Sequence, residues 1–350
     1  MSVKQSDDDY QSDEEYQSDD NSVDDYPSLK EPSDGYSSSE NSDNDDNDDN
    51  DDMEDNETES SKIFFKACID GDITTVQGYL DDDTFDPNIG SDKQSPLCGA
   101  CEYEQYAVIK ILVSDDRVDL NKGNEYDETP LIMACANNDI DTVKLLLDNP
   151  KVDINKHDTN CGETAFIHSC YYRSYDAIKI LLENDKLDIT AKDCDDETGL
   201  HSLCNFDYRH DNDRLSEHIE ITKLIIDHPQ TDLNARDASG STPLHNACMS
   251  AFVPIVKHLL ENPKLNPMMK GDHGDTVFHH VINWAHTHMK GSADSILIMK
   301  LLLEDDRCDP NEPNNDGDTP FMTLCDENFI DAIQCFIENC DSVDLFTQCA

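Results

Sequence analysis

The sequence predicts an all-α fold, a solenoid of about eight helix-turn-helix repeats with hairpin tips, preceded by a disordered acidic tail. A three-residue pattern that begins with Ser or Thr returns seven times between residues 95 and 321, at steps of 34, 35, 34, 44, 34 and 43 residues. The composition also changes near residue 61, from Asp, Ser and Asn to apolar residues at helical spacing. A fixed period of this length is typical of stacked repeats, each of which buries its apolar face only against its neighbours.

The tail is predicted to span residues 1–60, which contain 24 Asp and Glu against two Lys. Low hydrophobicity with charge of one sign predicts a segment without fixed structure. Ser6, Ser12 and Ser42 each have an acidic residue three positions later, the pattern that acid-directed kinases prefer. Phosphorylation there would add further negative charge. Two interpretations stay open: a recognition or regulatory arm, and a tail that only increases solubility.

Each repeat is predicted to begin at the Ser or Thr of the returning pattern. Thr242 suits a helix N-cap and Pro243 the first helical position. The small residue Ala247 allows close helix packing, and a second helix such as 140–147 has apolar residues along one face. Gly71, Asn138 and Asn328 can adopt the left-handed turn between the two helices. The repeat motifs start near residues 62, 95, 129, 164, 198, 242, 276 and 319.

The motif Thr242-Pro243-Leu244-His245-Asn246-Ala247 and the preceding residues 232–241 resemble the ankyrin-repeat family. The resemblance covers residues 62–350 and implies an ankyrin domain over residues 61–350 that binds other proteins and is not an enzyme. An additional residue in segments such as 149–153 explains the common step of 34. The two long steps predict insertions near residues 205–217 and 286–294, both between the helices of their repeats.

The cysteines and histidines of the repeats are explained by packing and by the repeat motif, without a redox or metal role. Seven Cys share one position after the small residue of the first helix, which predicts core packing as reduced thiols. A metal site was considered in the seventh repeat, but His279 matches the motif histidines and the other His follow no ligand spacing. We therefore predict no metal and no cofactor. The residues concerned are Cys68, Cys101, Cys135, Cys170, Cys204, Cys248 and Cys325, and His273, His279, His280, His286 and His288 around Trp284.

Composition disfavours several classes of function. A formal net charge of -53 opposes direct binding of nucleic acid, which requires clusters of Lys and Arg. We find no signal peptide, no apolar run long enough to cross a membrane, and no phosphate-binding loop or catalytic motif. These observations predict a soluble, non-enzymatic monomer in the cytoplasm and/or nucleus.

The predicted binding site lies where the family commonly contacts partners, on the concave surface at the last two positions of each first helix. The second of these positions is aromatic in four of six repeats. Aromatic side chains surrounded by charge are typical of interface hot spots, although the rings could instead pack on adjacent repeats. We expect a protein partner with a basic or mixed basic and apolar surface. The proposed residues are Tyr103, Tyr171, Tyr172, Phe206 and Trp284, with the acidic hairpin residues Glu125, Glu128, Asp195, Glu197, Asp272, Asp275 and Asp318.

A second function is compatible with the same charge. The chain could act as an acidic decoy that sequesters basic, nucleic-acid-binding proteins by imitating phosphate. Salt distinguishes the two functions, because screening weakens a purely electrostatic complex more than one with aromatic contacts.

Overall fold

The computed structural model describes residues 58–91, 93–206, 214–288, 293–327 and 329–339, without the side chains of Trp284 and residues 286–288. These residues contain sixteen α-helices and no strand. The predicted all-α class is therefore confirmed. Among the described helices, none is both long and apolar enough for a membrane crossing. The tail, with Ser6, Ser12 and Ser42, lies outside the described residues.

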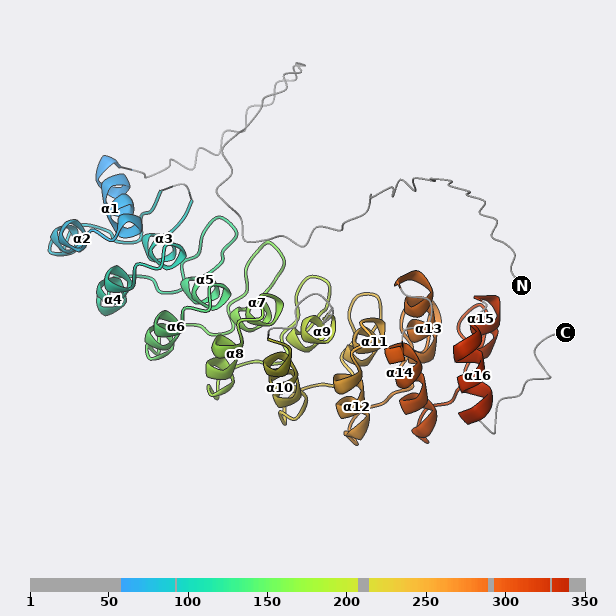
Figure 1. Cartoon of the computed structure of the whole chain (residues 1–350). Helices are drawn as coiled ribbons and strands as arrows, with labels where there is room; N and C mark the ends of the chain where they lie inside the picture. The colour runs from blue at the N-terminus through green and yellow to red at the C-terminus, as the bar shows by residue number, and fades with distance from the viewer. Residues whose placement is uncertain (1–57, 92, 207–213, 289–292, 328, 340–350) are drawn as a thin grey trace, which may run out of the picture. The chain divides into compact units, whose positions relative to one another are not determined.

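Helices of the described repeats form two rows, in which each helix packs against the next member of its own row and against its partner in the same repeat (Figure 1). We call the odd-numbered row the inner row, because the long hairpin loops lie on its side in Figure 1. The inner helices are α1 (Glu59–Asp70), α3 (Pro96–Glu102), α5 (Pro130–Ala136), α7 (Ala165–Tyr171), α9 (Gly199–Cys204), α11 (Pro243–Met249), α13 (Val277–His288) and α15 (Pro320–Asp326).

The even-numbered helices form the outer row. A 3₁₀ turn, η1 (Asp272–Gly274), occupies the hairpin before α13. The outer helices are α2 (Ile73–Leu80), α4 (Tyr106–Ser114), α6 (Ile140–Leu147), α8 (Tyr175–Leu182), α10 (Leu215–Ile226), α12 (Val253–Glu261), α14 (Ala293–Glu304) and α16 (Ile330–Asn339).

Inner helices begin at the Ser and Thr residues of the motif. The Thr129 hydroxyl accepts a hydrogen bond from the Ile132 backbone N–H, 3.2 Å away. Where His stands three residues after Thr, as in Thr242 and His245, the imidazole Nδ1 also accepts the Thr backbone N–H at 3.1 Å. Both bonds satisfy N–H groups that a helix start leaves free. The first helix starts at Glu59 by the same means, with Thr58 as its N-cap.

Left-handed residues end the inner helices. Gly71 and Asn138 have φ values of 75° and 52°, as the sequence predicted, and Asn328 lies outside the described residues. Arg173 and Ala251 take the same conformation in their repeats although neither is a usual choice for it. Each bend lets the next backbone N–H return to the helix; Phe252 N, for example, donates to Ala247 O at 2.8 Å.

The core runs between the two rows. Six of the seven aligned Cys are buried, and burial raises the pKa of Cys68 and Cys135 to about 12, so both remain neutral thiols. The expectation of core packing is wrong for Cys325, which is exposed. It lies on the last inner helix, α15, and no later described helix covers it.

Backbone hydrogen bonds join the tips of successive hairpins. The Cys194 N–H donates to Cys161 O at 2.7 Å, and the Ala238 N–H donates to Asp195 O at the same distance. Equivalent bonds join the tips of repeats three and four and of repeats seven and eight. Among the described residues, the tips of repeats six and seven have no such bond. The described hairpins are therefore joined tip to tip from repeat three to repeat six and again between repeats seven and eight.

Candidate functional site

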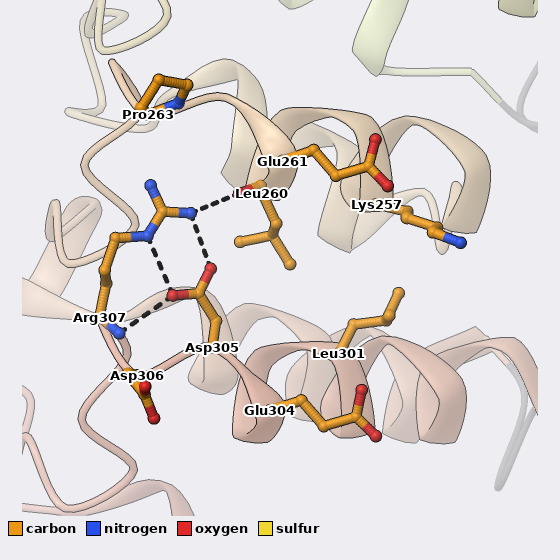
Figure 2. Close-up of a pocket in the computed structure, with 9 residues that line it drawn as sticks. All are labelled: Lys257, Leu260, Glu261, Pro263, Leu301, Glu304, Asp305, Asp306 and Arg307. Atoms are coloured by element: carbon orange, nitrogen blue, oxygen red, sulfur yellow. Dashed lines mark hydrogen bonds and ion pairs between the residues drawn. The ribbon is translucent and has the colours of Figure 1, made fainter.

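One pocket lies between the outer helices α12 and α14 (Figure 2). It has a volume of about 590 Å³, but its central Arg307 is already bound within the protein. The guanidinium pairs twice with Asp305, at 2.7 and 2.9 Å, and lowers the pKa of that carboxyl. It also donates to the backbone carbonyls of Leu260, Asn262 and Leu265 in the preceding repeat. We assign Arg307 a structural role, as a clamp between repeats six and seven.

The second pocket is an acidic groove on the hairpin side of the inner helices. It has a volume of about 300 Å³ and extends over repeats five, six and seven. Its floor comes from the ends of α9 and α11, and its rim from the hairpins. The lining residues are Glu197, Asn205, Asp237, Ser239, Ser241, Asn246, Met249, Asp272 and His280. We call this pocket the acidic groove. It brings together two residues that the sequence predicted as acidic contacts, Glu197 and Asp272.

The electrostatic field of the groove is strongly negative. Burial, followed by the nearby carboxylates Asp193 and Asp237, raises the pKa of Glu197 to about 7. Burial also raises the pKa of Asp193, with Glu163 and Asp195 contributing. Asp193 and Asp237 accept hydrogen bonds from the hairpin backbone and Ser239. Because the neighbouring carboxylates repel one another, an added cation would be favoured at this place.

The tyrosines of the predicted site are exposed at the ends of inner helices. Tyr103 and Tyr171 are each 54% exposed and Tyr172 is 51% exposed. Tyr171 and Tyr172 meet edge to face at 5.2 Å, and Tyr172 also stacks on His168 at 5.7 Å. They therefore form an apolar patch that remains open to a partner. Trp284 lies in α13, but its side chain is outside the described part of the chain.

Phe206 is not a surface residue, and its predicted place in the binding site is wrong. Its ring is 1% exposed and stacks on His218 at 4.0 Å. Phe252 lies 5.6 Å away, and the Arg173 guanidinium lies 4.6 Å from the ring centroid. The ring packs on adjacent repeats, as the alternative interpretation allowed. Position in the motif could not show this, because the rings that cover Phe206 come from α10 and from the next repeat.

The predicted acidic residues fall into two sets. Residues at the hairpin tips are exposed, whereas residues that directly precede the Thr N-caps are half-buried in the hairpin stems. Of these seven residues, Glu197 and Asp272 line the acidic groove. The tip set is Glu125, Asp195 and Asp272, and the stem set is Glu128, Glu197, Asp275 and Asp318.

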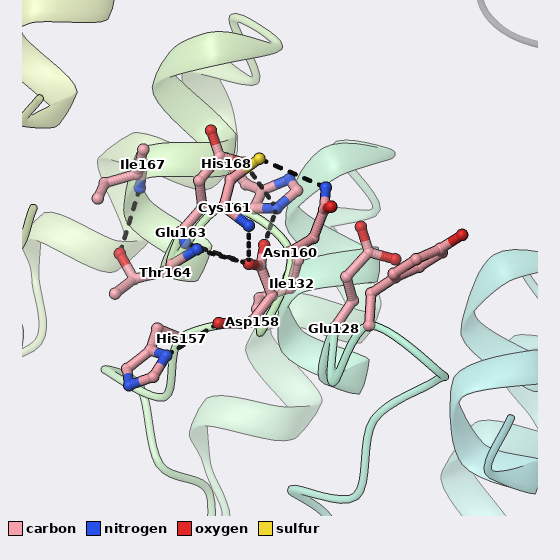
Figure 3. Close-up of polar contacts among 12 residues, drawn as sticks. Glu128, Ile132, His157, Asp158, Asn160, Cys161, Glu163, Thr164, Ile167 and His168 are labelled. Carbon is pink, nitrogen blue, oxygen red and sulfur yellow. Dashed lines mark hydrogen bonds and ion pairs between the residues drawn. The ribbon is translucent and has the colours of Figure 1, made fainter. Parts of the chain in front are cut away.

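A second polar cluster lies at the fourth repeat, next to the tyrosine patch (Figure 3). His168 Nε2 is 3.1 Å from Asp158 Oδ2 and 3.0 Å from Glu163 Oε2. Glu128 of the preceding repeat also faces it. Burial alone would lower the pKa of His168, but the bonds to Asp158 and Glu163 and the field of Glu128 raise it to about 9. We call these four residues the His168 cluster.

Comparison with known proteins identifies the repeat. A family profile described as ankyrin repeats in three copies matches residues 64–158 and 100–193, and a second ankyrin-repeat profile matches residues 200–260. Together these matches cover more than half of the chain. The chain belongs to the ankyrin-repeat family.

Solved ankyrin structures share this fold. The ankyrin-repeat domain of Bcl-3, described as a member of the IkappaB family, is 20% identical, with a TM-score of 0.54, and the match covers 68% of this chain and 98% of that domain. The ankyrin-repeat protein EF0377 is 19% identical (TM-score 0.52; 59% and 96% covered). An ankyrin domain from Acinetobacter baumannii is 22% identical (TM-score 0.51; 60% and 97% covered). No curated protein matches the sequence. At these identities the likeness shows the fold alone.

The ankyrin motif also explains the histidines of the seventh repeat. His279 Nδ1 accepts the Thr276 backbone N–H, and Nε2 lies 3.0 Å from Asp318 O in the next repeat. Burial lowers the pKa of His279, so the ring acts as a neutral cap. His273 is exposed, while the side chains of His286 and His288 lie outside the described residues.

Sequence reasoning missed the His168 cluster. Its signal is positional: His168 stands four residues after the N-cap of its ankyrin repeat, Glu163 stands one residue before that cap, and Asp158 begins the hairpin turn. Equivalent residues of adjacent repeats meet only because the repeats stack in register. A comparison of each position across the repeats would have shown the residues of the His168 cluster, which a search for complete motifs does not.

Proposed function

We propose that this ankyrin-repeat protein binds a protein partner through its hairpin face, with the acidic groove holding basic side chains of the partner. The observation that carries the proposal is the convergence of Glu197, Asp237 and Asp272 in one pocket. Burial first, and then the neighbouring carboxylates, raise the pKa of Glu197 to about 7. A partner cation would bring positive charge to these carboxylates.

The groove also has groups that favour an ordered contact over attraction alone. Met249 and the amides of Asn205 and Asn246 line its floor. An apolar surface with a few directed polar groups is typical of specific sites. The exposed Tyr171 and Tyr172 lie on the preceding inner helix, α7, and would extend the same contact toward the fourth repeat. We therefore favour a partner segment with both basic and apolar residues.

The experiment is affinity capture with the full chain, followed by titration of each captured protein. Two variants with equal charge change are compared. Glu197→Gln with Asp272→Asn alters the groove, while Glu304→Gln with Asp306→Asn alters exposed carboxylates on the outer side. We expect the groove variant to weaken the partner by about tenfold or more, as for hot-spot residues, and the outer variant to have little effect at moderate salt.

The acidic decoy remains the second candidate, favoured by the net charge of -53. For a decoy, both variants would weaken binding equally, and moderate salt would release every captured protein. That outcome would overturn groove recognition. Adding Tyr172→Ala to the comparison tests the apolar part of the contact, because the change does not alter the charge.

A further inference from the structure

The His168 cluster brings two carboxylates to one imidazole nitrogen, with the Glu128 carboxylate within 4.8 Å of the ring. One N–H group cannot donate a strong hydrogen bond to two acceptors at once, yet His168 Nε2 lies within 3.1 Å of both Asp158 and Glu163. No Lys or Arg among the described residues pairs with the cluster carboxylates; the only other polar side chain is Asn124, whose amide donates to Glu128. A protonated His168 would bring a single positive charge against three negative ones. The arrangement therefore favours an additional cation.

The ligand atoms already have the spacing of a coordination sphere. Those of Glu128, Asp158 and His168 lie within 4.8 Å of one another. Two tetrahedral ligands at about 2.0–2.2 Å from one ion are about 3.3–3.6 Å apart. His168 and Asp158, at 3.1 Å, are already near this spacing, and a pair at the 4.8 Å limit would have to close by about 1.3 Å. The groups are also enclosed: His168 is 5% exposed and Asp158 is 2% exposed.

One of the ligands, Asp158, is oriented before any ion arrives. Asp158 Oδ1 accepts the backbone N–H groups of Cys161 and Gly162, both at 2.9 Å, which directs Oδ2 toward His168. The His168 ring has no hydrogen-bond partner at Nδ1 among the described residues. All polar contacts of this buried ring are thus with carboxylates. A ligand fixed as Asp158 is loses little entropy on binding.

We propose that the His168 cluster is a binding site for a divalent transition-metal ion, and that Zn²⁺ fits its ligands best. Imidazole suits Zn²⁺ and disfavours Mg²⁺ and Ca²⁺, which prefer oxygen ligands alone. The site would link repeats three and four, because Glu128 comes from one and the other ligands come from the next. It goes beyond partner binding, and its test does not depend on any partner.

The repeats themselves supply variants that should fold. Asn124 and Asn314 replace Asp158 in repeats three and eight and accept the same kind of backbone N–H bonds. Asn246 replaces His168 in repeat six. Asp158→Asn and His168→Asn therefore remove one ligand each while keeping a residue that this chain already uses at the same position.

Two controls make the same change where no such site exists. Asp193→Asn alters the equivalent hairpin position in repeat five, where Ser202 replaces His168. His280→Asn alters the equivalent histidine in repeat seven, where Gly271 replaces Asp158. Repeat five also offers a gain of function, because Asp193, Glu197 and Glu163 already occupy the three carboxylate positions there. Ser202→His would complete a second cluster.

The measurement is calorimetric titration of the full chain with Zn²⁺ in a buffer containing Mg²⁺, which occupies weak surface carboxylates. We expect one strong site in the wild type, retained in both controls, weakened at least about tenfold in Asp158→Asn and His168→Asn, and doubled in Ser202→His. With Co²⁺, the wild type should give visible absorption bands that the two ligand variants lack. Thermal unfolding of each apo variant verifies folding.

Two results would overturn the proposal. In one, wild type and the two ligand variants bind Zn²⁺ equally, so that the ion is held by the tail or by surface carboxylates. In the other, wild type shows no site stronger than the background, and the cluster is held together by the His168 proton alone.

Discussion

Carboxylates on the hairpin face differ in charge according to the residue that stands four positions after the N-cap. Beside His168, hydrogen bonds from the imidazole and the hairpin backbone outweigh burial, and the pKa of Asp158 is lowered. Beside Ser202, the equivalent Asp193 and Glu197 have raised pKa values, chiefly through burial. One residue per repeat thus determines whether that part of the face is balanced or has excess negative charge.

This difference predicts a pH-dependent effect of Glu197→Gln on stability. The pKa of Glu197 is about 7 in the folded chain, against an ordinary value of 4.5. The favourable contribution of neutral Glu197 to the free energy of unfolding is fully present below pH 4.5. It is lost as pH rises through 7, because the carboxylate that then forms is unfavourable in the folded chain. We expect the variant to match wild type at pH 5 and to unfold roughly 2 °C higher at pH 8, a small shift because solvent screens this partly exposed group.

Thermal unfolding at the two pH values measures the effect. Glu304→Gln, which removes an exposed carboxylate on the outer side, serves as the control for the loss of one carboxylate. An equal shift for Glu197→Gln at pH 5 and pH 8 would contradict the assigned pKa.

At the scale of elements, the period of the motif predicted the helix pairs well. The caps at Thr and the turns at Gly71 and Asn138 follow from local chemistry, which the sequence contains in full. The insertions were less predictable. Both were placed between helices, but α10, α13 and α14 each have twelve residues, so part of the added length continues the helices. A step of 44 residues gives the added length and not its conformation, which depends on packing against adjacent repeats.

The candidate site was predictable only in part, for the same reason. Glu197 and Asp272 were found because the family motif places hairpin residues beside the inner helices. Phe206 was misplaced, and His168 was overlooked, because their surroundings come from neighbouring repeats. Contacts between repeats depend on the stacking distance, which no single motif contains.

The corrected role of Phe206 predicts a stability effect where the sequence predicted a binding effect. Phe206 precedes the insertion, and His218 follows it in α10. The two rings stack, and His218 also contacts Leu203 O and the Tyr175 hydroxyl at 2.9 and 2.8 Å. We expect Phe206→Ala to reduce the free energy of unfolding by about 3–5 kcal/mol, the usual cost of removing a buried ring.

Urea denaturation followed by circular dichroism tests this prediction. Tyr103→Ala is the matched control, because its ring is exposed, and it should change the free energy of unfolding by only about 0.5 kcal/mol. A loss of stability at Tyr103 as large as that at Phe206 would contradict the assignment.

At the scale of the described repeats, the junction between repeats six and seven differs from the others. The tip-to-tip backbone bond is missing there, and His245 Nε2 has no hydrogen-bond partner, whereas His201 and His279 each contact a carbonyl of the next repeat. The Asp275 carbonyl is near enough to influence the pKa of His245, but the two groups do not reach hydrogen-bond geometry. On the outer side, Arg307 still binds three carbonyls of repeat six.

Amide hydrogen exchange should detect this asymmetry. We expect the hairpin at residues 271–275 to exchange faster than the hairpin at residues 193–197, because fewer bonds must open to expose it. Equal protection of the two hairpins would show that the missing bonds have no consequence for local opening.

The junction between repeats six and seven is held more firmly on its outer side than at its hairpin tips. Arg307 joins the outer sides of the two repeats, while on the hairpin side the Arg236 guanidinium donates to Lys270 O at 3.0 Å and no backbone bond joins the described tips. The acidic groove opens between those tips, since Asp237 and Ser239 line it from one side and Asp272 from the other. A small outward rotation of repeats seven and eight about the Arg307 contact would widen the acidic groove. The groove would then accept basic side chains of different size while the core stays intact.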